Sequence, residues 1–373
     1  MPEEYDYDLV VVGGGPAGSS AAFAAAKNGI KVALIEKENS IAETVRTSGV
    51  TWIESIKEFG IPDNCYNPIK NFSFVSPNNE VTISDSIATA AVLDVRKTYR
   101  WLANEAEETG ADIFLKININ EVIKNENNDI VGVKGTGPKG EIIFHSKIVI
   151  DATGFTSVIS KAMGFVTQWK RFGAGAEYEA IVENSDPDTW WLMVGQEYTP
   201  AGYAWIFPLG NNIVRIGVGV GKPESDIDPT QRLKEIIEKQ LGPIKKLGKI
   251  TPIEFHYGLI PNDGLSRKTV FNNLILVGDS AGQANPLVLE GIRYAIRFGR
   301  VAGKVASDAI KNKKTDKEAL LFACIKLEIL SGLESLKEDA ARRQAIQLQM
   351  LTNKFNKSSD GLDNLDGLLV SFI

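Results

Sequence analysis

A glycine-rich turn near the start of the chain, Gly13-x-Gly15-x-x-Gly18, limits what this sequence can fold into more than any other feature. The β-branched run at residues 8–12 predicts a buried strand before the turn, and the small residues at 19–27 predict a helix after it. A second buried strand is predicted at 31–35. A strand, a turn, a helix and a strand within about 30 residues form a βαβ unit, so we expect a parallel sheet that contains this unit.

The glycines of this turn have distinct tasks in a nucleotide site. Gly13 permits the tight turn, Gly15 lets the backbone approach a pyrophosphate, and Gly18 lets the helix and strand pack closely. The helix start offers free N–H groups and a partial positive charge to the phosphates. Glu36 ends the second strand, where a carboxylate can accept hydrogen bonds from ribose hydroxyls. The segment predicts an adenine-dinucleotide site.

The same glycine pattern occurs again from Gly135 to Gly140, but in a different context. Residues 141–144 read as a strand, so no helix follows this second match. Without a helix there is neither a dipole nor a ring of free amides to bind phosphate. The second match therefore predicts a hairpin turn.

A buried-strand pattern returns at residues 273–277 and ends in Gly278-Asp279. An aspartate at a strand end can hold a polyol chain, which a nicotinamide nucleotide lacks. Further on, Gly291 and Ile292 open a predicted helix. A glycine-led helix start can direct amides at an electron-rich ring edge, as in a reduced flavin. Together with the first turn, this segment favours FAD as the cofactor.

Composition excludes several other classes. The chain is 43% hydrophobic and 24% charged, which is ordinary for a globular protein. A net charge of −6 argues against nucleic-acid binding. With two cysteines and two histidines, we expect no disulfide scaffold and no metal site. No apolar run approaches the roughly 20 residues that span a bilayer, and no signal peptide precedes the first strand, so we expect a cytoplasmic protein.

Residues 165–265 differ from the segments on either side. They are dense in aromatic side chains and alternate like strands, which predicts an antiparallel sheet inserted into the first domain. We expect a discontinuous nucleotide-binding domain at 1–70, 91–164 and 266–312, a substrate-binding sheet domain at 71–90 and 165–265, and a helical C-terminal region at 313–373.

Three blocks, Gly13–Gly18, Asp151-Ala-Thr-Gly154 and Gly278–Pro286, resemble the para-hydroxybenzoate hydroxylase-type FAD superfamily. Within it the chain is most similar to the geranylgeranyl reductases, which include archaeal digeranylgeranylglycerophospholipid reductases. The run Pro200-x-x-Tyr203-x-Trp205-x-Phe207-Pro208 fits their substrate-domain motif. The resemblance covers about residues 5–310. It implies an α/β (α+β) fold with a Rossmann-like FAD-binding domain, an inserted antiparallel sheet and C-terminal helices.

The resemblance also implies which residues contact the cofactor. Arg96 would touch it from the start of the second helix, Val122 would meet the adenine, and Asp279 would bind the ribityl or pyrophosphate region. Gly291 and Ile292 would lie beside the isoalloxazine. The full implied set is Gly13, Gly15, Pro16, Ala17, Gly18, Glu36, Lys37, Arg46, Thr47, Gly49, Arg96, Val122, Ala152, Gly154, Gly278, Asp279, Pro286, Gly291 and Ile292.

The chain departs from the family pattern in two places. Many members carry a Cys-Gly segment near the flavin, and our alignment puts Arg46 where that cysteine would stand. Arg46 could stabilise an anionic flavin, bind a substrate phosphate, or be solvated. In addition, Asp151-Ala-Thr-Gly154 replaces the Asp-Gly motif that helps the hydroxylases to dock NADPH. The electron donor therefore stays open between NAD(P)H and a ferredoxin-like protein.

The aromatic run supplies the candidate substrate residues Tyr203, Trp205, Phe207 and Pro208. They could line an apolar tunnel for a polyisoprenoid chain, or they could form an ordinary sheet core. We expect Pro208 to end the strand. Trp190, Trp191 and Tyr198 could widen the same wall, but the sequence does not place them.

The remaining reactive side chains have plainer interpretations. His256 lies in a strand-like segment and is expected to be structural rather than a general acid. Cys65 lies in a predicted turn, and Cys324 is expected in a helix core. The apolar end at 368–373 could touch a membrane surface peripherally or dock on the protein body.

These features lead to one hypothesis and three alternatives. We expect an FAD-dependent oxidoreductase of isoprenoid lipid biosynthesis, in which reduced FAD passes hydride to C=C bonds of a geranylgeranyl chain on a prenyl diphosphate or prenylated lipid. Its catalytic side chains are not identified, because the flavin performs the chemistry. The alternatives are a flavin-dependent monooxygenase or halogenase on an aromatic substrate, a FixC-like electron-transfer flavoprotein, and a non-catalytic prenyl-lipid carrier.

Overall fold

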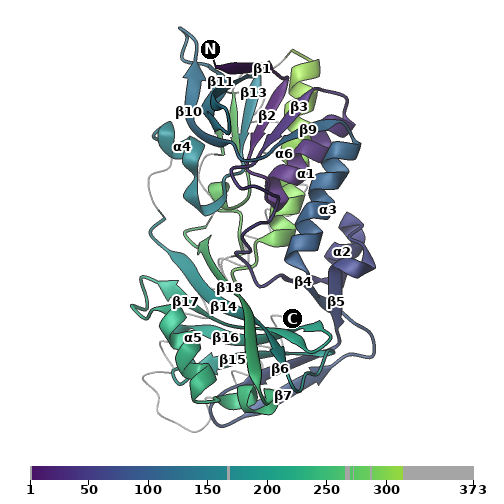
Figure 1. Ribbon diagram of the computed structural model, residues 1–373, viewed down its shortest axis with the longest axis vertical. Coiled ribbons are helices and arrows are strands. Elements are labelled where there is room, and N and C mark those ends of the chain that lie inside the picture. Colours follow the sequence, from purple (N-terminus) through teal and green to yellow (C-terminus); the bar gives the residue numbers. More distant parts are fainter. Residues whose placement is uncertain (1, 166–168, 265–268, 272, 286–287, 314–373) are drawn as a thin grey trace.

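Two lobes follow one another along the long axis of the molecule, each built around its own sheet (Figure 1). The computed structural model describes residues 2–165, 169–264, 269–271, 273–285 and 288–313. We call the two parts the parallel lobe and the antiparallel lobe, after the pairing of most of their strands.

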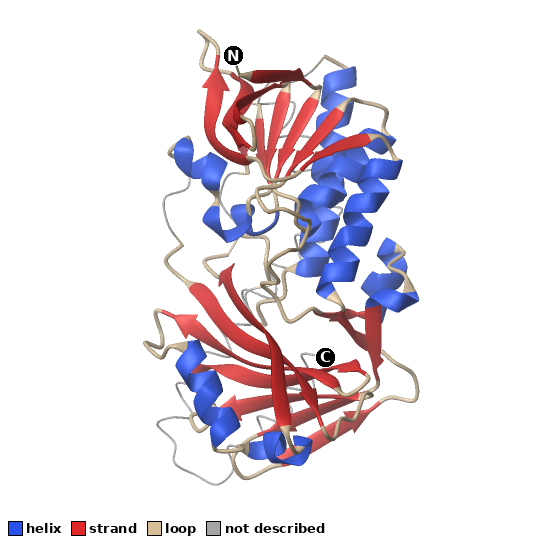
Figure 2. Cartoon of the chain, in the orientation of Figure 1, coloured by secondary structure: helices blue, strands red, loops and turns tan. Residues whose placement is uncertain are grey.

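The parallel lobe contains a six-stranded sheet in the order β19-β20-β13-β2-β3-β9, in which every pair except β19–β20 is parallel. Its strands are β2 (Leu9–Val12), β3 (Val32–Ile35), β9 (Ala111–Phe114), β13 (Ile148–Asp151), β19 (Val270–Phe271) and β20 (Leu274–Leu276). Three helices lie side by side on one face: α1 (Pro16–Lys27), α3 (Val95–Glu108) and α6 (Ile292–Lys311) (Figure 2).

The other face of this sheet packs on a four-stranded sheet in the order β1-β12-β11-β10. Its strands are β1 (Glu3–Asp6), β10 (Asn118–Lys124), β11 (Ile130–Gly137) and β12 (Gly140–His145). Because both faces are covered, the inner strands are apolar throughout, and all four residues of β2, β3 and β13 are buried.

Helices α1 and α6 approach each other very closely because both carry small residues at their contact. A Cβ atom on Gly299 or on Gly303 of α6 would overlap the carbonyl oxygens of Ala17 and Ala21 in α1. Ala17 lies opposite Gly299 and Ala21 opposite Gly303, so the two helices run in the same direction and their N-termini point to the same end of the sheet (Figure 1).

The antiparallel lobe contains a seven-stranded sheet in the order β18-β14-β17-β16-β15-β6-β7. Only the β15–β6 pair is parallel. Its strands are β6 (Asn71–Val75), β7 (Glu80–Ser84), β14 (Phe172–Val182), β15 (Thr189–Gly195), β16 (Thr199–Gly210), β17 (Ile213–Lys222) and β18 (Ile250–Pro261). Helix α5 (Pro229–Glu238) and the 3₁₀ segment η3 (Gly242–Leu247) cover its outer face.

A small three-stranded sheet, in the order β4-β8-β5, joins the lobes. It consists of β4 (Val50–Trp52), β5 (Tyr66–Ile69) and β8 (Ala90–Leu93), and α2 (Ile53–Phe59) follows β4. The 3₁₀ turn η1 (Asp63–Cys65) precedes β5 and buries Cys65, which confirms the predicted turn. Three further short segments are η2 (Gly154–Thr156), α4 (Val158–Ala162) and η4 (Gly278–Ala281).

The predicted α/β fold, with a parallel sheet and a second, antiparallel one, is confirmed. The hairpin expected at Gly135–Gly140 is also confirmed, because β11 and β12 pair through Gly137 and Gly140. Helix α1 begins at Pro16, earlier than predicted, since proline is well accommodated in the first helical turn. Among the described residues, no helix is long and apolar enough to cross a membrane.

The prediction that Pro208 ends its strand is wrong. Strand β16 continues to Gly210, and Pro208 pairs with Val214 next to a register shift. Such irregular positions tolerate a residue that lacks a backbone N–H group. The predictions for Cys324, for residues 368–373 and for the rest of 314–373 lie outside the described residues, as does the one for Pro286.

Candidate active site

The glycine turn after β2 has the geometry that its sequence predicts. Gly13 has a φ of +110°, and a Cβ on it would overlap the carbonyl oxygen of Ala152. A Cβ on Gly18 would overlap the carbonyl of Gly13. Gly15 precedes α1, and among the described residues no heavy atom lies within 4 Å of where its Cβ would stand. The turn is closed on the protein side and open above the N-terminus of α1, where Pro16 and Ala17 begin the helix.

Glu36 lies directly over this turn. Its Oε2 accepts a hydrogen bond of 2.7 Å from the Gly14 amide, and its Oε1 accepts one of 2.9 Å from the Glu38 amide. The carboxylate thus stands at the end of β3, beside the turn, at the carboxyl edge of the sheet where open α/β folds bind ligands. Lys37, next in the chain, is exposed.

Two further strand ends meet the turn. Buried Asp151 accepts hydrogen bonds from the amides of Thr153 (3.0 Å) and Ser160 (2.9 Å), which fixes the Ala152–Gly154 bend after β13. After β20, Gly278 has a φ of +67°, and a Cβ on it would stand 3.0 Å from the Ala17 side chain. The strand ends therefore bring Gly13, Ala17, Ala152 and Gly278 together.

Among the described residues at this edge, Asp279 is the carboxyl group whose pKa is strongly perturbed. Burial raises its pKa from 3.8 to about 6. Its Oδ1 lies 3.5 Å from where a Cβ on Gly291 would stand, so it sits beside the start of α6 and Ile292. A carboxylate held in a poorly solvated position next to a helix N-terminus is suited to accept hydrogen bonds from ligand hydroxyls.

Two of the other predicted cofactor residues, Arg96 and Val122, make the following contacts within the protein. Arg96 makes a bidentate ion pair with Glu254 of β18, at 2.6 and 3.0 Å, and donates to the Ala42 and Glu43 carbonyls. Val122 packs, partly buried, between the two sheets of the parallel lobe.

Arg46 is half exposed, with 52% of its side chain accessible, and it pairs with Glu38 at 2.5 Å. Of the three roles considered for it, this position matches the solvated one. Its backbone does bridge the lobes, since a Cβ on Gly258 of β18 would overlap the Arg46 carbonyl. Thr47 is half-buried, and Gly49 is buried against the Leu93 carbonyl and Arg215.

Three of the four predicted substrate residues, Tyr203, Trp205 and Phe207, lie on the side of the seven-stranded sheet that faces the parallel lobe. The rings of Tyr203 and Trp205 are 5.7 Å apart, and those of Trp205 and Phe207 are 5.8 Å apart. Trp190 continues the row, 5.6 Å from Phe207. The Tyr203 hydroxyl donates a 2.9 Å hydrogen bond to the Val288 carbonyl, in the segment just before α6. The row thus leads from the helix start that adjoins Asp279 into the antiparallel lobe.

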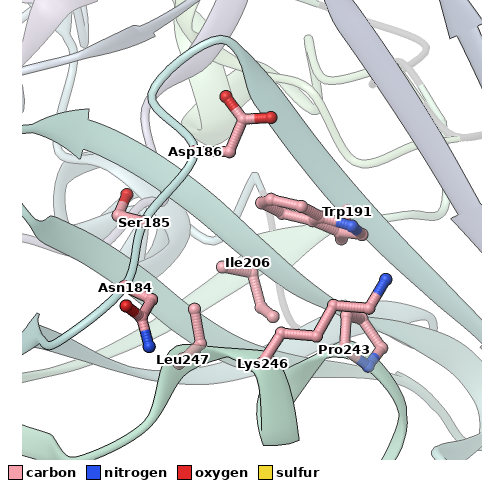
Figure 3. Close-up of a pocket in the computed structure, with 8 residues that line it drawn as sticks. All are labelled: Asn184, Ser185, Asp186, Trp191, Ile206, Pro243, Lys246 and Leu247. Atoms are coloured by element: carbon pink, nitrogen blue, oxygen red, sulfur yellow. The ribbon is translucent and has the colours of Figure 1, made fainter.

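Pro208, Trp191 and Tyr198 belong to the opposite side. Pro208 alternates with Phe207 along β16, and Trp191 pairs with Ile206. Trp191 and Ile206 line a groove of about 300 Å³, together with Asn184, Ser185, Asp186, Pro243, Lys246 and Leu247 (Figure 3). This groove is separated from the aromatic row by the thickness of the sheet, so it is not part of the candidate site.

Sequence reasoning missed a group of buried and partly buried charged side chains on the side that carries the aromatic row. We call Glu177, Glu179, Arg215, Glu254 and His256 the charged cluster. His256 is buried and lies 2.8 Å from Glu177, as expected of a structural histidine. The signal in the sequence was the alternation of Glu177 with Glu179 and of Glu254 with His256 in strand-like segments that carry no other charged or histidine side chain. Opposite charges on such strands are partners for one another.

Comparison with known proteins agrees with this arrangement. A family model described as FAD dependent oxidoreductase matches residues 8–180, and one described as geranylgeranyl reductase catalytic domain matches residues 173–260. The digeranylgeranylglycerophospholipid reductase of Methanocaldococcus jannaschii is 34% identical, over 96% of this chain and 92% of its own. The digeranylgeranylglycerophospholipid reductase 1 of Methanopyrus kandleri is 34% identical over 83% of each chain.

Solved structures show the same relationship. A geranylgeranyl bacteriochlorophyll reductase-like protein from Thermoplasma acidophilum superposes with a TM-score of 0.79 and 25% identity, over 98% of this chain and 100% of that one. A flavin-dependent brominase shares the fold at a TM-score of 0.68 and 19% identity, over 98% of this chain and 93% of that one. The chain belongs to the geranylgeranyl reductase family and is a flavin-dependent oxidoreductase.

Proposed function

We propose that this protein uses FAD to reduce C=C bonds of a geranylgeranyl chain carried by a prenylated glycerophospholipid or a prenyl diphosphate. The observation that carries the proposal is the aromatic row of Tyr203, Trp205 and Phe207, which begins at the segment before α6 and matches the family's substrate motif. Relatives named as reductases of such lipids match nearly the whole chain. Peripheral contact with the membrane that holds the lipid is part of this proposal.

The residues at the carboxyl edge of the parallel sheet fit FAD. The open N-terminus of α1 above Gly15 suits a pyrophosphate, and Glu36 suits the adenosine ribose. Asp279 suits a ribityl chain, whose hydroxyls would return the hydrogen bonds that the carboxylate loses on burial. FAD bound there would supply the hydride chemistry.

The protein's own contribution would be to orient the chain and keep water away from it. A polyisoprenoid has no polar handle along its length, so only apolar contact can align one double bond with the reacting ring. The aromatic row offers such contact, and it is continuous with Trp190, which packs 4.9 Å from Phe72. Exclusion of water would also protect a reduced ring from side reactions.

The test is an anaerobic turnover experiment. The purified protein is checked for bound flavin by its visible spectrum, reduced with dithionite, and mixed with geranylgeranyl diphosphate or an unsaturated archaeal-type lipid. We expect the flavin to be reoxidised and the product to gain roughly 2 mass units for each double bond reduced. Using dithionite makes the result independent of whether NAD(P)H or a ferredoxin-like protein is the donor.

The opposite result would favour the fold's other chemistry. If the reduced flavin stayed stable, the lipid were unchanged and the protein then reacted rapidly with oxygen, the reductase proposal would fail. A monooxygenase or halogenase would take its place, as in the brominase that shares the fold. Purification without any bound flavin would instead support a non-catalytic lipid carrier.

A further inference from the structure

Four neighbouring strands, β18, β14, β17 and β16, present an unusual surface to the parallel lobe. Their register places His256, Glu177, Gly217 and Trp205 in one row across the sheet. In the next row Gly258, Gly175 and Gly219 stand beside Tyr203. The surface therefore has almost no aliphatic side chains. Its shape is set by bare backbone, by Trp205 and by the charged cluster.

The indole of Trp205 lies flat on this bare backbone. A Cβ on Gly217 would overlap the Cζ2 and Cε2 atoms of the ring, and a Cβ on Gly219 would stand 3.3 Å from its Cζ3. Beyond them, a Cβ on Gly175 would stand 3.6 Å from its Cη2. We call Gly175, Gly217 and Gly219 the glycine strip. The ring thus extends from β16 across β17 to β14. The glycine strip leaves room for the ring but provides no side chain that fixes its orientation.

The orientation of the Trp205 ring is fixed by a hydrogen bond to Glu177. The Trp205 Nε1–H donates a 3.0 Å hydrogen bond to Glu177 Oε2, and both groups are buried. A buried indole N–H needs such an acceptor, and this one fixes the ring's rotation about its long axis. The other carboxylate oxygen, Oε1, lies 2.8 Å from His256 Nδ1 and 3.8 Å from Arg215 Nε. Glu177 is therefore held from both sides while it holds the ring.

The small three-stranded sheet and the parallel lobe fix this arrangement in turn. Arg215 donates to Glu179 and, through Nη1, to the carbonyls of Ser48 (2.9 Å) and Leu93 (3.0 Å). From the other direction Arg96 of α3 pairs with Glu254, which lies 3.4 Å from His256 Nε2. Through these contacts, the position of Glu177, which accepts the hydrogen bond from Trp205, is fixed relative to the parallel lobe.

We propose that Glu177 is a positioning residue, which acts through its hydrogen bond to Trp205 to hold the indole in the orientation in which the aromatic row aligns the substrate chain. The inference rests on the proposed function, because it takes the aromatic row to be the substrate wall. If the ring could rotate, it would no longer present the same surface to the substrate chain. The affinity for the chain would fall, whereas the chemical step at the flavin would be unchanged.

The kinetic test compares variants in anaerobic turnover of geranylgeranyl diphosphate by the dithionite-reduced holoenzyme. For both Trp205→Phe and Glu177→Leu we expect KM to rise about tenfold with kcat nearly unchanged, since each removes one charge-assisted hydrogen bond. Glu177→Gln keeps an acceptor and should stay within about twofold of the wild type. In the double variant, Glu177→Leu should add nothing to Trp205→Phe.

Trp191→Phe is the matched control, because this tryptophan lies on the opposite side of the sheet and should leave KM unchanged. An additive double variant, or a Glu177→Leu enzyme with wild-type KM, would overturn the proposal. If Glu177→Leu does not fold, the ¹⁵N–¹H resonance of the Trp205 indole decides. It is assigned by its loss in Trp205→Phe, and we expect it to shift in Glu177→Gln.

An indole resonance that does not move in Glu177→Gln would overturn the proposal as well. This spectroscopic arm requires no turnover, so it separates the inference from the proposed function. If the wild-type protein leaves geranylgeranyl diphosphate unchanged, but the indole resonance still shifts in Glu177→Gln, Glu177 remains the residue that positions Trp205 and only the substrate assignment fails.

Discussion

The two large sheets place functional groups in opposite ways. In the parallel lobe the strands are buried on both faces, and the candidate cofactor residues stand beyond their carboxyl ends, at Gly13, Glu36, Ala152 and Gly278. In the antiparallel lobe the candidate substrate residues stand on the broad side of the sheet, along β16. The candidate site therefore uses the carboxyl edge of the parallel sheet and one face of the antiparallel sheet.

The difference follows from how each sheet is covered. Helices and a second sheet leave the parallel sheet no free side, so only its loops can meet a ligand. The antiparallel sheet packs α5 and η3 on one side only, with Val218, Ile216 and Ala176 turned toward them. Its other side is free to carry glycine, charge and aromatic rings. The flavin edge is therefore built from short local motifs, whereas the substrate wall is built from residues that only strand register brings together.

The largest effect should come from breaking the charged cluster of the antiparallel sheet. Arg215→Met leaves Glu179 and the Ser48 and Leu93 carbonyls without their donor. Buried charges that lose their partner typically cost about 3–5 kcal/mol, so we expect a loss of that size in the free energy of unfolding, measured by urea denaturation.

Arg171→Met is the control for this prediction, since Arg171 is half exposed in its ion pair with Glu224. It should change stability by less than about 1 kcal/mol. Equal losses in the two variants would mean that the cluster has no special role.

The next effect tests the edge of the parallel sheet. Gly13→Ala should cost about 2–3 kcal/mol, because the position requires a positive φ and the added Cβ meets the Ala152 carbonyl. It should also lower flavin affinity at least about tenfold, as measured by flavin titration of the apoprotein. Gly140→Ala has a similar φ, +119°, without the overlap, so it should lose some stability and keep the flavin. Normal flavin binding by Gly13→Ala would contradict the proposed turn geometry.

A third prediction concerns pH. The pKa of Asp279 is raised from 3.8 to about 6, so the folded apoprotein bears the cost of a buried charge above about pH 6 and is free of it below about pH 4. Because Asp279 is partly exposed, we take that cost as about 2 kcal/mol. Asp279→Asn should therefore raise the Tm of the apoprotein at pH 7, with a gain that shrinks toward pH 4. The same variant should hold flavin less tightly, and a gain in Tm independent of pH would refute the explanation.

The smallest effect should be that of Arg46. Its ion pair with Glu38 is half exposed, so Arg46→Ala should cost less than about 1 kcal/mol, and less still at high salt. We also expect flavin content and turnover close to wild type. A large fall in the rate of flavin reoxidation by substrate would show instead that this arginine does reach the flavin or the substrate phosphate.

Much of the parallel lobe could be predicted because its signals are contiguous. The turn from Gly13 to Gly18 lies between its own strand and helix, and the strand that ends at Gly278-Asp279 carries its own pattern. The aromatic row of the antiparallel lobe could be predicted for the same reason, because Tyr203, Trp205 and Phe207 lie on one strand.

What could not be predicted depends on partners far away in the sequence. Nothing local distinguishes Trp190, which joins the aromatic row, from Trp191, which faces the opposite groove. That choice is made by the register of β15 with β6 and β16. Likewise, Glu177 contacts Trp205 and His256 only after the four strands β18, β14, β17 and β16 have paired. The ion pair of Arg96 with Glu254 is another such contact, because the two residues lie far apart in the chain.

The glycine strip has a consequence for how this enzyme could change its substrate range. Because glycine has no side chain, any substitution at Gly175, Gly217 or Gly219 adds atoms. Such substitutions can reduce the space beneath the Trp205 ring but cannot increase it. The glycine strip already leaves the Trp205 ring as much room as these three positions can give. At this part of the aromatic row, space for a bulkier lipid has to come from replacing Trp205 with a smaller residue. Trp205 is therefore the position at which evolution or design can make room for such a substrate.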